Sequence, residues 1–141
     1  MNGLLERLAT SCPKTWEGYG PLQNLLIEDC EFHSRSGGIH FGASAWRDYV
    51  NVTIRRVRVL DAHAGRTLQV RGPGSIRGVH VSNLLVARTT FNAPCYPWMG
   101  NAQPVLLSTD EWKDGPAGKT GLPAGQISDV VFENVTAQAE N

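Results

Sequence analysis

Hydrophobic and polar residues alternate in four stretches of this chain that align with one another without gaps. The stretches are 24–32, 51–59, 78–86 and 129–137, and in each the second and fourth residues are apolar. The next apolar pair comes one residue later than strict alternation requires, so the pattern shifts by one and then continues. Alternation with period two predicts a β-strand, and the shift predicts a bend that keeps the apolar face inward.

The predicted bend falls on equivalent residues of the four stretches, namely Asp29, Arg56, Asn83 and Asn134. Asp and Asn are the non-glycine residues that most readily adopt a left-handed backbone, so three of the four residues suit a corner. Arg56 is not of this type, and nothing in the sequence explains its presence there.

The spacing of the stretches predicts the architecture. The first three follow one another at a constant 27-residue interval, and the 51-residue interval before the fourth is about two turns or one turn with a long insertion. Further short strands are expected at 38–42, 67–71 and 104–108, with the inward residues Ile39, Phe41, Leu68, Val70, Val105 and Leu107. Short strands recurring at one interval predict an all-β fold, a parallel β-helix of about four to five coils.

This repeat divides the chain into a β-helix at 24–141 and a preceding segment, 1–23, that caps one end or completes an earlier coil. A helix is possible at 3–9. The segments 91–103 and 110–126 read as loops on either side of the strand at 104–108, and insertions that gather on one face of a solenoid usually mark its working face. An antiparallel sandwich of seven or eight strands is the alternative, but it leaves the 27-residue interval unexplained.

Composition and charge exclude several function classes. The 141 residues carry no formal net charge, which argues against a nucleic-acid binder that relies on phosphate attraction. No apolar run approaches the roughly 20 residues of a membrane span, and the first ten residues lack the apolar core of a secretory signal. Three cysteines without C-x-x-C spacing do not suggest zinc, and we expect no metal or cofactor and buried or incidental thiols.

The zero net charge hides a local imbalance. Residues 1–89 carry eleven basic and seven acidic residues, whereas 90–141 carry two and six. We interpret the run Arg55, Arg56 and Arg58 as one basic outer face, since too few aromatics lie among them for a nucleic-acid site. The glycosylation patterns at Asn51 and Asn134 coincide with repeat positions, so we interpret both residues as structural.

The segments Ser36–Gly42 and Leu68–Gly72, together with the alternating coils, resemble the polygalacturonase-like glycoside hydrolases of family 28. The resemblance runs from about Leu22 to Asn141 and implies the right-handed parallel β-helix of the pectin-lyase-like superfamily. The closing segment, 125–136, is similar to the penultimate coils of that family. The chain therefore resembles a C-terminal half.

The departures from the family pattern bear on activity. Family members carry Asn-Thr-Asp and Asp-Asp segments, whose aspartates act as acid and base, upstream of Gly-His-Gly. Neither segment occurs in this chain, and Ser36-Gly37-Gly38 stands at the place of Gly-His-Gly. The family's substrate-gripping Arg-Ile-Lys corresponds to Gln69-Val70-Arg71, in which Arg71 keeps a charge suited to a uronate carboxylate.

Alternation on the second set of strands predicts a ligand surface. If Ile39 and Phe41 face inward, His40 faces outward, and we expect Gln69 and Leu106 to stack on it in successive turns. Arg71 and Ser108 would lie one step along. The alternative is that His40 is an ordinary surface imidazole; the other three histidines have no ligand spacing.

Four further residues near the predicted loops are candidates for chemistry. Asp110 and Glu111 are adjacent carboxylates directly after the strand at 104–108, and they are weak candidates for catalysis. Trp98 and Trp112 could stack on sugar rings. The alternatives are solvated carboxylates and tryptophans that fold back to anchor the loops.

The resemblance implies part of an enzyme that hydrolyses glycosidic bonds in a uronate-containing or pectic polysaccharide. This chain would supply cleft wall and substrate-binding residues and would be inactive alone, because the family's aspartates are missing. A non-catalytic β-helix that binds a glycan or a protein is the alternative. The family implies an extracellular location. We expect no nucleic-acid or membrane partner, and we expect self-association through open coil ends.

Overall fold

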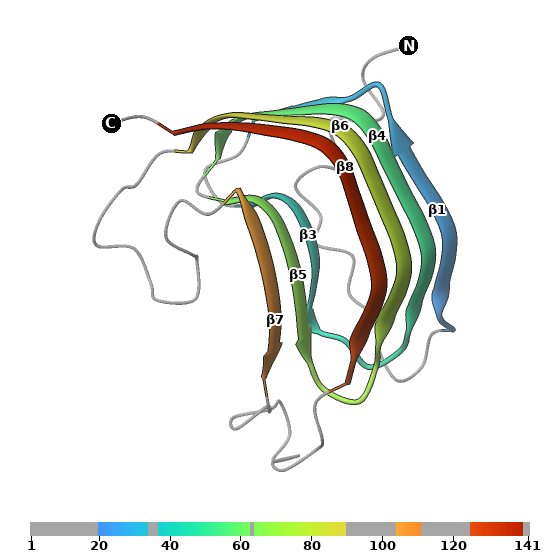
Figure 1. Cartoon of the computed structure of the whole chain (residues 1–141). Coiled ribbons are helices and arrows are strands. Elements are labelled where there is room, and N and C mark those ends of the chain that lie inside the picture. Colours follow the sequence, from blue (N-terminus) through green and yellow to red (C-terminus); the bar gives the residue numbers. More distant parts are fainter. Residues whose placement is uncertain (1–19, 34–36, 63, 90–103, 111–124, 140–141) are drawn as a thin grey trace.

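The structure, a computed structural model, describes residues 20–33, 37–62, 64–89, 104–110 and 125–139. The expected helix at 3–9 lies outside them. The described residues form strands and no helix (Figure 1). The strands are β1 (Leu22–Glu28), β2 (Glu31–His33), β3 (Gly37–Ser44), β4 (Tyr49–Ala62), β5 (Ala64–Arg71), β6 (Ile76–Thr89), β7 (Val105–Asp110) and β8 (Ile127–Ala139).

The strands form two sheets in which every pair is parallel. The first sheet has the order β1-β4-β6-β8, with β2 also beside β4, and the second has the order β3-β5-β7. The long strands of the first sheet bend midway, and the second sheet lies on their concave side (Figure 1). The antiparallel sandwich is therefore wrong, because no described pair is antiparallel.

The strand register follows the repeat interval of the sequence. Leu22 pairs with Tyr49, and Tyr49 pairs with Ile76, so each of these steps is one regular interval. Ile76 pairs directly with Ile127, so the longer interval before the fourth stretch is one step with an insertion and not two turns. In the second sheet, Arg66 pairs with Val105, and this step is also longer than the regular interval. Its excess is half of the excess between Ile76 and Ile127. The additional residues therefore divide equally between the segments before and after β7.

The predicted corner residues adopt the left-handed conformation. Asp29, Arg56, Asn83 and Asn134 have φ angles of 53°, 52°, 52° and 51°. A left-handed residue interrupts the extended strand, which accounts for the one-residue shift in the apolar pattern. Asn134 Nδ2 donates a hydrogen bond of 2.5 Å to Asn83 Oδ1, so these two corners are also linked by their side chains.

A second set of left-handed residues was not predicted. Asn24, Asn51, Gly78 and Asp129 have φ angles of 57°, 56°, 66° and 53°. They occupy the first position of the four aligned stretches, and Asn51 Nδ2 donates to Asn24 Oδ1 at 2.6 Å. Asn, Gly and Asp are the residue types that most readily adopt the left-handed conformation, so this second bend could also have been predicted from the sequence.

The hydrophobic core lies between the two sheets. The inward residues of the middle strands are buried, and Phe41 packs edge-to-face on Tyr49 with ring centroids 5.8 Å apart. The prediction for Ile39, Phe41, Leu68 and Val70 is confirmed. The main contributors are Val52, Ile54, Val57, Val59, Ile76, Val79, Val81, Leu84 and Val86.

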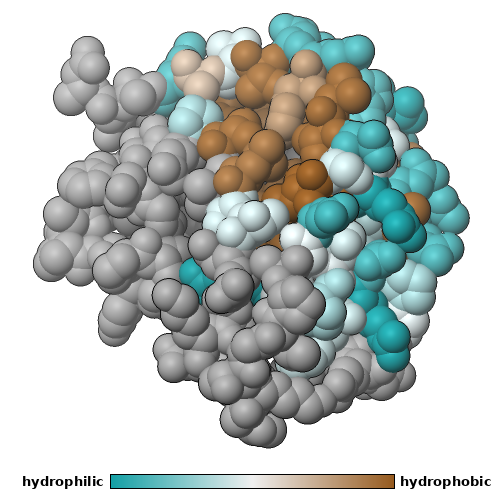
Figure 2. Space-filling model, turned by 60° about the horizontal axis from the view of Figure 1, so that its bottom comes forward, coloured by the Kyte–Doolittle hydropathy of each residue, from teal (hydrophilic) through white to brown (hydrophobic). Residues whose placement is uncertain are grey.

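The core is less covered at the terminal strands. Leu107 on β7 is 47% exposed although it was expected to face inward, because β7 is the edge strand of the second sheet. Four apolar residues of β8 are only partly buried, namely Ile127, Val130, Phe132 and Val135. Figure 2 shows apolar residues gathered into one patch on this side of the molecule.

Candidate functional site on the second sheet

Residues of the second sheet that point away from the core form the candidate site. The strand register determines which of them are neighbours. His40 pairs with Thr67, and Thr67 pairs with Leu106. Gln69 pairs instead with Gly42 and Ser108. The expected stack is therefore correct for Leu106 but wrong by two residues for Gln69, because the regular repeat interval also holds between β3 and β5. The interval places Thr67, and not Gln69, beside His40.

Gln69 and Arg71 form the polar centre of this surface. Residues two apart on a strand share a face, so both side chains point away from the core. Gln69 is nevertheless only 7% exposed. With its amide oriented to satisfy both groups, Gln69 Oε1 accepts hydrogen bonds from Arg71 Nε at 3.2 Å and from Nη2 at 2.9 Å. The buried amide thus fixes the guanidinium, and because Gln69 is neutral this contact does not cancel the charge of Arg71.

The neighbours of Arg71 in the register are Ser44 on β3 and Asp110 on β7. Asp110 is the last residue of β7, and the structure describes its backbone position but not its side chain. His40 and Ser108 are half-buried on the same sheet. The predicted site residues Trp98, Glu111 and Trp112 lie outside the described residues. The structure therefore brings Gln69, Arg71 and Ser108 together.

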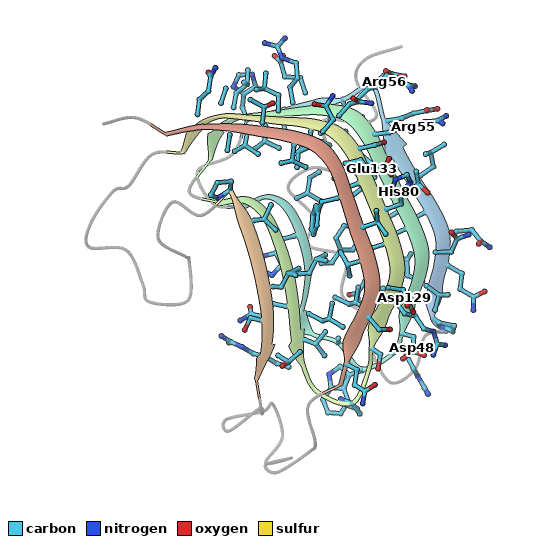
Figure 3. The ribbon with its side chains drawn as sticks, viewed as in Figure 1. Asp48, Arg55, Arg56, His80, Asp129 and Glu133 are labelled. Carbon is cyan, nitrogen blue, oxygen red and sulfur yellow. The ribbon has the colours of Figure 1, made fainter. Side chains whose placement is uncertain are left out.

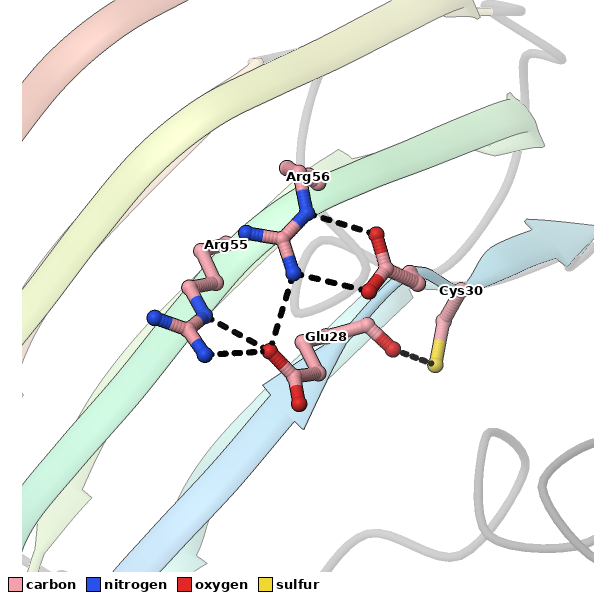
Figure 4. Close-up of polar contacts among 5 residues, drawn as sticks. Glu28, Cys30, Arg55 and Arg56 are labelled. Carbon is pink, nitrogen blue, oxygen red and sulfur yellow. Dashed lines mark hydrogen bonds and ion pairs between the residues drawn. The ribbon is translucent and has the colours of Figure 1, made fainter.

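The outer face of the first sheet is not simply basic, as the arginine run suggested. Arg55 Nη2 lies 2.6 Å from Glu28 Oε2 (Figure 4). Arg58 Nη1 lies 2.9 Å from Glu31 Oε2. Each arginine follows its carboxylate partner by one repeat interval, so the repeat itself places each acid beside a base. The local excess of arginine seen in the sequence is compensated here by the acids of β1 and β2.

Arg56 makes the most extensive of these contacts. Its Nε and Nη2 donate to the two carboxylate oxygens of Asp29 at 2.6 and 2.8 Å, and Nη2 also donates to Glu28 at 3.0 Å (Figure 4). These hydrogen bonds hold the pKa of Asp29 below its usual range and raise the pKa of Arg56. The two-pronged contact gives the physical reason for an arginine at a left-handed corner, which the sequence alone did not provide.

Cys30 and the histidines of the first sheet make contacts with nearby residues. The Cys30 thiol is buried and donates to the Glu28 carbonyl at 3.0 Å, and burial raises its pKa. His80 Nε2 lies 3.1 Å from Glu133, and both side chains point away from the core (Figure 3). The described part of the chain contains no group of three His, Cys, Asp or Glu side chains arranged to hold a metal. Cys12 and Cys95 lie outside it.

Comparison of the chain with protein-family models, with curated proteins and with solved structures finds no match. Among the described residues, no helix is long and apolar enough to cross a membrane.

Proposed function

We propose that the chain is a right-handed parallel β-helix of about four to five coils and that it forms part of a polygalacturonase-like glycoside hydrolase. Two parallel sheets joined alternately by the chain support this fold. Crossover connections between parallel strands are right-handed in about 98% of cases, which supports the handedness. The second sheet would then form the wall of a cleft that binds an acidic polysaccharide.

The observation that carries the proposed function is the position of Arg71. Its guanidinium is held by Gln69 on the outward face of the second sheet. Guanidinium groups bind carboxylates through two parallel hydrogen bonds, and each uronate residue of a pectic chain offers one carboxylate. The contacts from Gln69 to Nε and Nη2 hold the guanidinium on this face. Ser108 is half-buried on the same sheet and is a further polar group there for sugar hydroxyls, whereas His40 Nε2 is buried.

The sequence favours ligand binding over bond cleavage by this chain alone. Inverting hydrolysis needs two carboxyl groups with room for a water molecule between them. The sequence contains neither the Asn-Thr-Asp nor the Asp-Asp segment that would supply them by resemblance. We therefore expect the isolated chain to bind an oligogalacturonate without releasing reducing ends.

Isothermal titration of the purified chain with an oligogalacturonate tests this proposal. A charge-assisted hydrogen bond contributes about 1.5–3 kcal/mol, so Arg71→Gln should weaken binding at least about tenfold. Arg77→Gln is the matched control, because Arg77 lies on the first sheet and is paired with Asp48 at 3.0 Å. This control should bind like the wild type, and a fully methyl-esterified oligomer should bind much more weakly than the free acid.

Two results would contradict the proposal. One is equal affinity of the wild type and Arg71→Gln for the acidic oligomer, which would place the ligand elsewhere. The other is no measurable binding by the folded wild-type chain. Release of reducing ends by the isolated chain would contradict the expectation that it is inactive, and Asp110→Asn and Glu111→Gln would then identify the carboxylates responsible.

A further inference from the structure

The first sheet ends on one side in β1 and on the other in β8, and no other described strand pairs with their outer edges. Both strands carry half-buried apolar residues on the core side. These are Leu22, Leu25 and Ile27 on β1, and Ile127, Val130, Phe132 and Val135 on β8. Part of this surface forms the apolar patch in Figure 2. Open edges of this kind pair with other chains unless something covers them.

The two edge strands match each other residue by residue. Their left-handed residues are Asn24 and Asp29 in the first stretch and Asp129 and Asn134 in the fourth, at the same spacing. A copy of β1 laid in register on β8 would therefore bend at the same places. Ile127 would meet Leu22 and Phe132 would meet Ile27, so apolar residues would face one another along the joint. An antiparallel joint that aligned the same corners would place Leu25 opposite Glu133, so the apolar faces would no longer match.

The exposed apolar residues of the first sheet fit the same joint. Leu26 is 49% exposed on β1 and Val131 is 48% exposed on β8. Leu26 pairs with Thr53, Thr53 with His80, and His80 with Val131, so these two residues are the ends of one stack. In a parallel joint the two ends would become neighbours and cover each other. Only one large apolar residue, Leu107 on the second sheet, shares their degree of exposure among the described residues.

We propose that, in solutions of this chain by itself, a second copy binds head-to-tail, with its β1 pairing in parallel and in register with β8 of the first. The same joint can repeat on the next copy, so the assembly is open and grows with concentration. The second sheet ends one strand earlier than the first, in β7, so the first sheet carries the joint.

Charge at the joint sets its expected strength. The register brings Glu28 of one copy beside Glu133 of the other, and like charges directly opposite are unfavourable. Each carboxylate is already paired within its own copy, Glu28 with Arg55 and Glu133 with His80. Glu133→Lys would replace the repulsion by attraction to Glu28. Cross-strand charge pairs contribute up to about 1 kcal/mol, so this variant should associate about fivefold more tightly.

Cysteine cross-linking tests the geometry of the joint. Neighbouring parallel strands are about 4.8 Å apart, within the Cα separation that a disulfide spans. A mixture of Leu26→Cys and Val131→Cys chains, oxidised at high concentration, should give an intermolecular disulfide between positions 26 and 131, identified by peptide mass spectrometry. Each variant alone is the matched control, since both retain the three native cysteines.

Sedimentation velocity over a wide concentration range completes the test. The proposal expects the weight-average mass of the wild type to rise with concentration, and to rise at lower concentration for Glu133→Lys. A monomer at all concentrations for both proteins would overturn it. A disulfide between two copies of position 131, in place of the mixed one, would also overturn it, because it requires an antiparallel joint between two β8 strands.

Discussion

Replacing Asn83 by valine tests whether the left-handed corners shape the first sheet. Asn83 has a φ angle of 52° and accepts a hydrogen bond from Asn134. The left-handed conformation costs an L-residue about 1–2 kcal/mol, and asparagine bears this better than a β-branched residue. Loss of the exposed hydrogen bond adds about 0.5–1 kcal/mol. Asn83→Val should therefore lower the free energy of unfolding by about 1.5–3 kcal/mol.

Two matched variants separate the backbone effect from the side-chain effect. Asn83→Gly loses the same hydrogen bond but has no Cβ to strain, so it should cost less than valine. Ser82→Val places the same residue one position earlier on β6, outside the left-handed positions, where valine suits a strand. Urea unfolding followed by far-UV circular dichroism gives the three free energies. Equal losses for Asn83→Val and Ser82→Val would refute the reasoning.

Three further predictions concern other parts of the fold. Gly74→Ala should lower the free energy of unfolding, measured by heat or urea, by about 1–3 kcal/mol. The added Cβ would collide with the Arg47 carbonyl oxygen and lie 2.8 Å from the Ala45 carbonyl oxygen. Gly20→Ala is the control and should be neutral, because nothing lies within 4 Å of its added Cβ. The pKa of Asp29 is lower in the folded chain than its ordinary 3.8, so its contribution to stability is present above pH 3.8 and is lost as the pH falls through the folded pKa. Asp29→Asn should therefore flatten the acid limb of the curve of unfolding free energy against pH. An unchanged acid limb would contradict this. The buried Cys30 thiol should react with iodoacetamide far more slowly in the native chain than in denaturant, as measured by peptide mass spectrometry, and equal rates would contradict its burial.

The sequence predicted the first sheet well because one simple rule governs it. Apolar residues alternate, and Asn83 and Asn134 mark the corner, so both burial and bend were readable. The ion pairs could also have been predicted, since Arg55 follows Glu28 by the repeat interval. Arg56 could not be explained from its own position, because its partner Asp29 is the corner residue one repeat interval earlier.

The second sheet was predicted less accurately, for a physical reason. Among the described residues, its strands have no left-handed corner residue to fix their alignment. Gln69 was therefore expected beside His40 but lies two residues further along, although Leu106 and the buried residues Leu68 and Val70 were correct. Period-two alternation determines which face a residue takes, and a shift of two leaves that face unchanged. The hydrogen bonds between Gln69 and Arg71 depend on side-chain geometry, which alternation does not determine.

The most direct test of the proposed function is a crystal structure of the chain with a bound oligogalacturonate. The account predicts a uronate carboxylate within hydrogen-bond distance, about 2.7–3.2 Å, of the Arg71 guanidinium on the outward face of the second sheet. An oligomer bound only to the first sheet, or one that binds identically in crystals of Arg71→Gln, would contradict it.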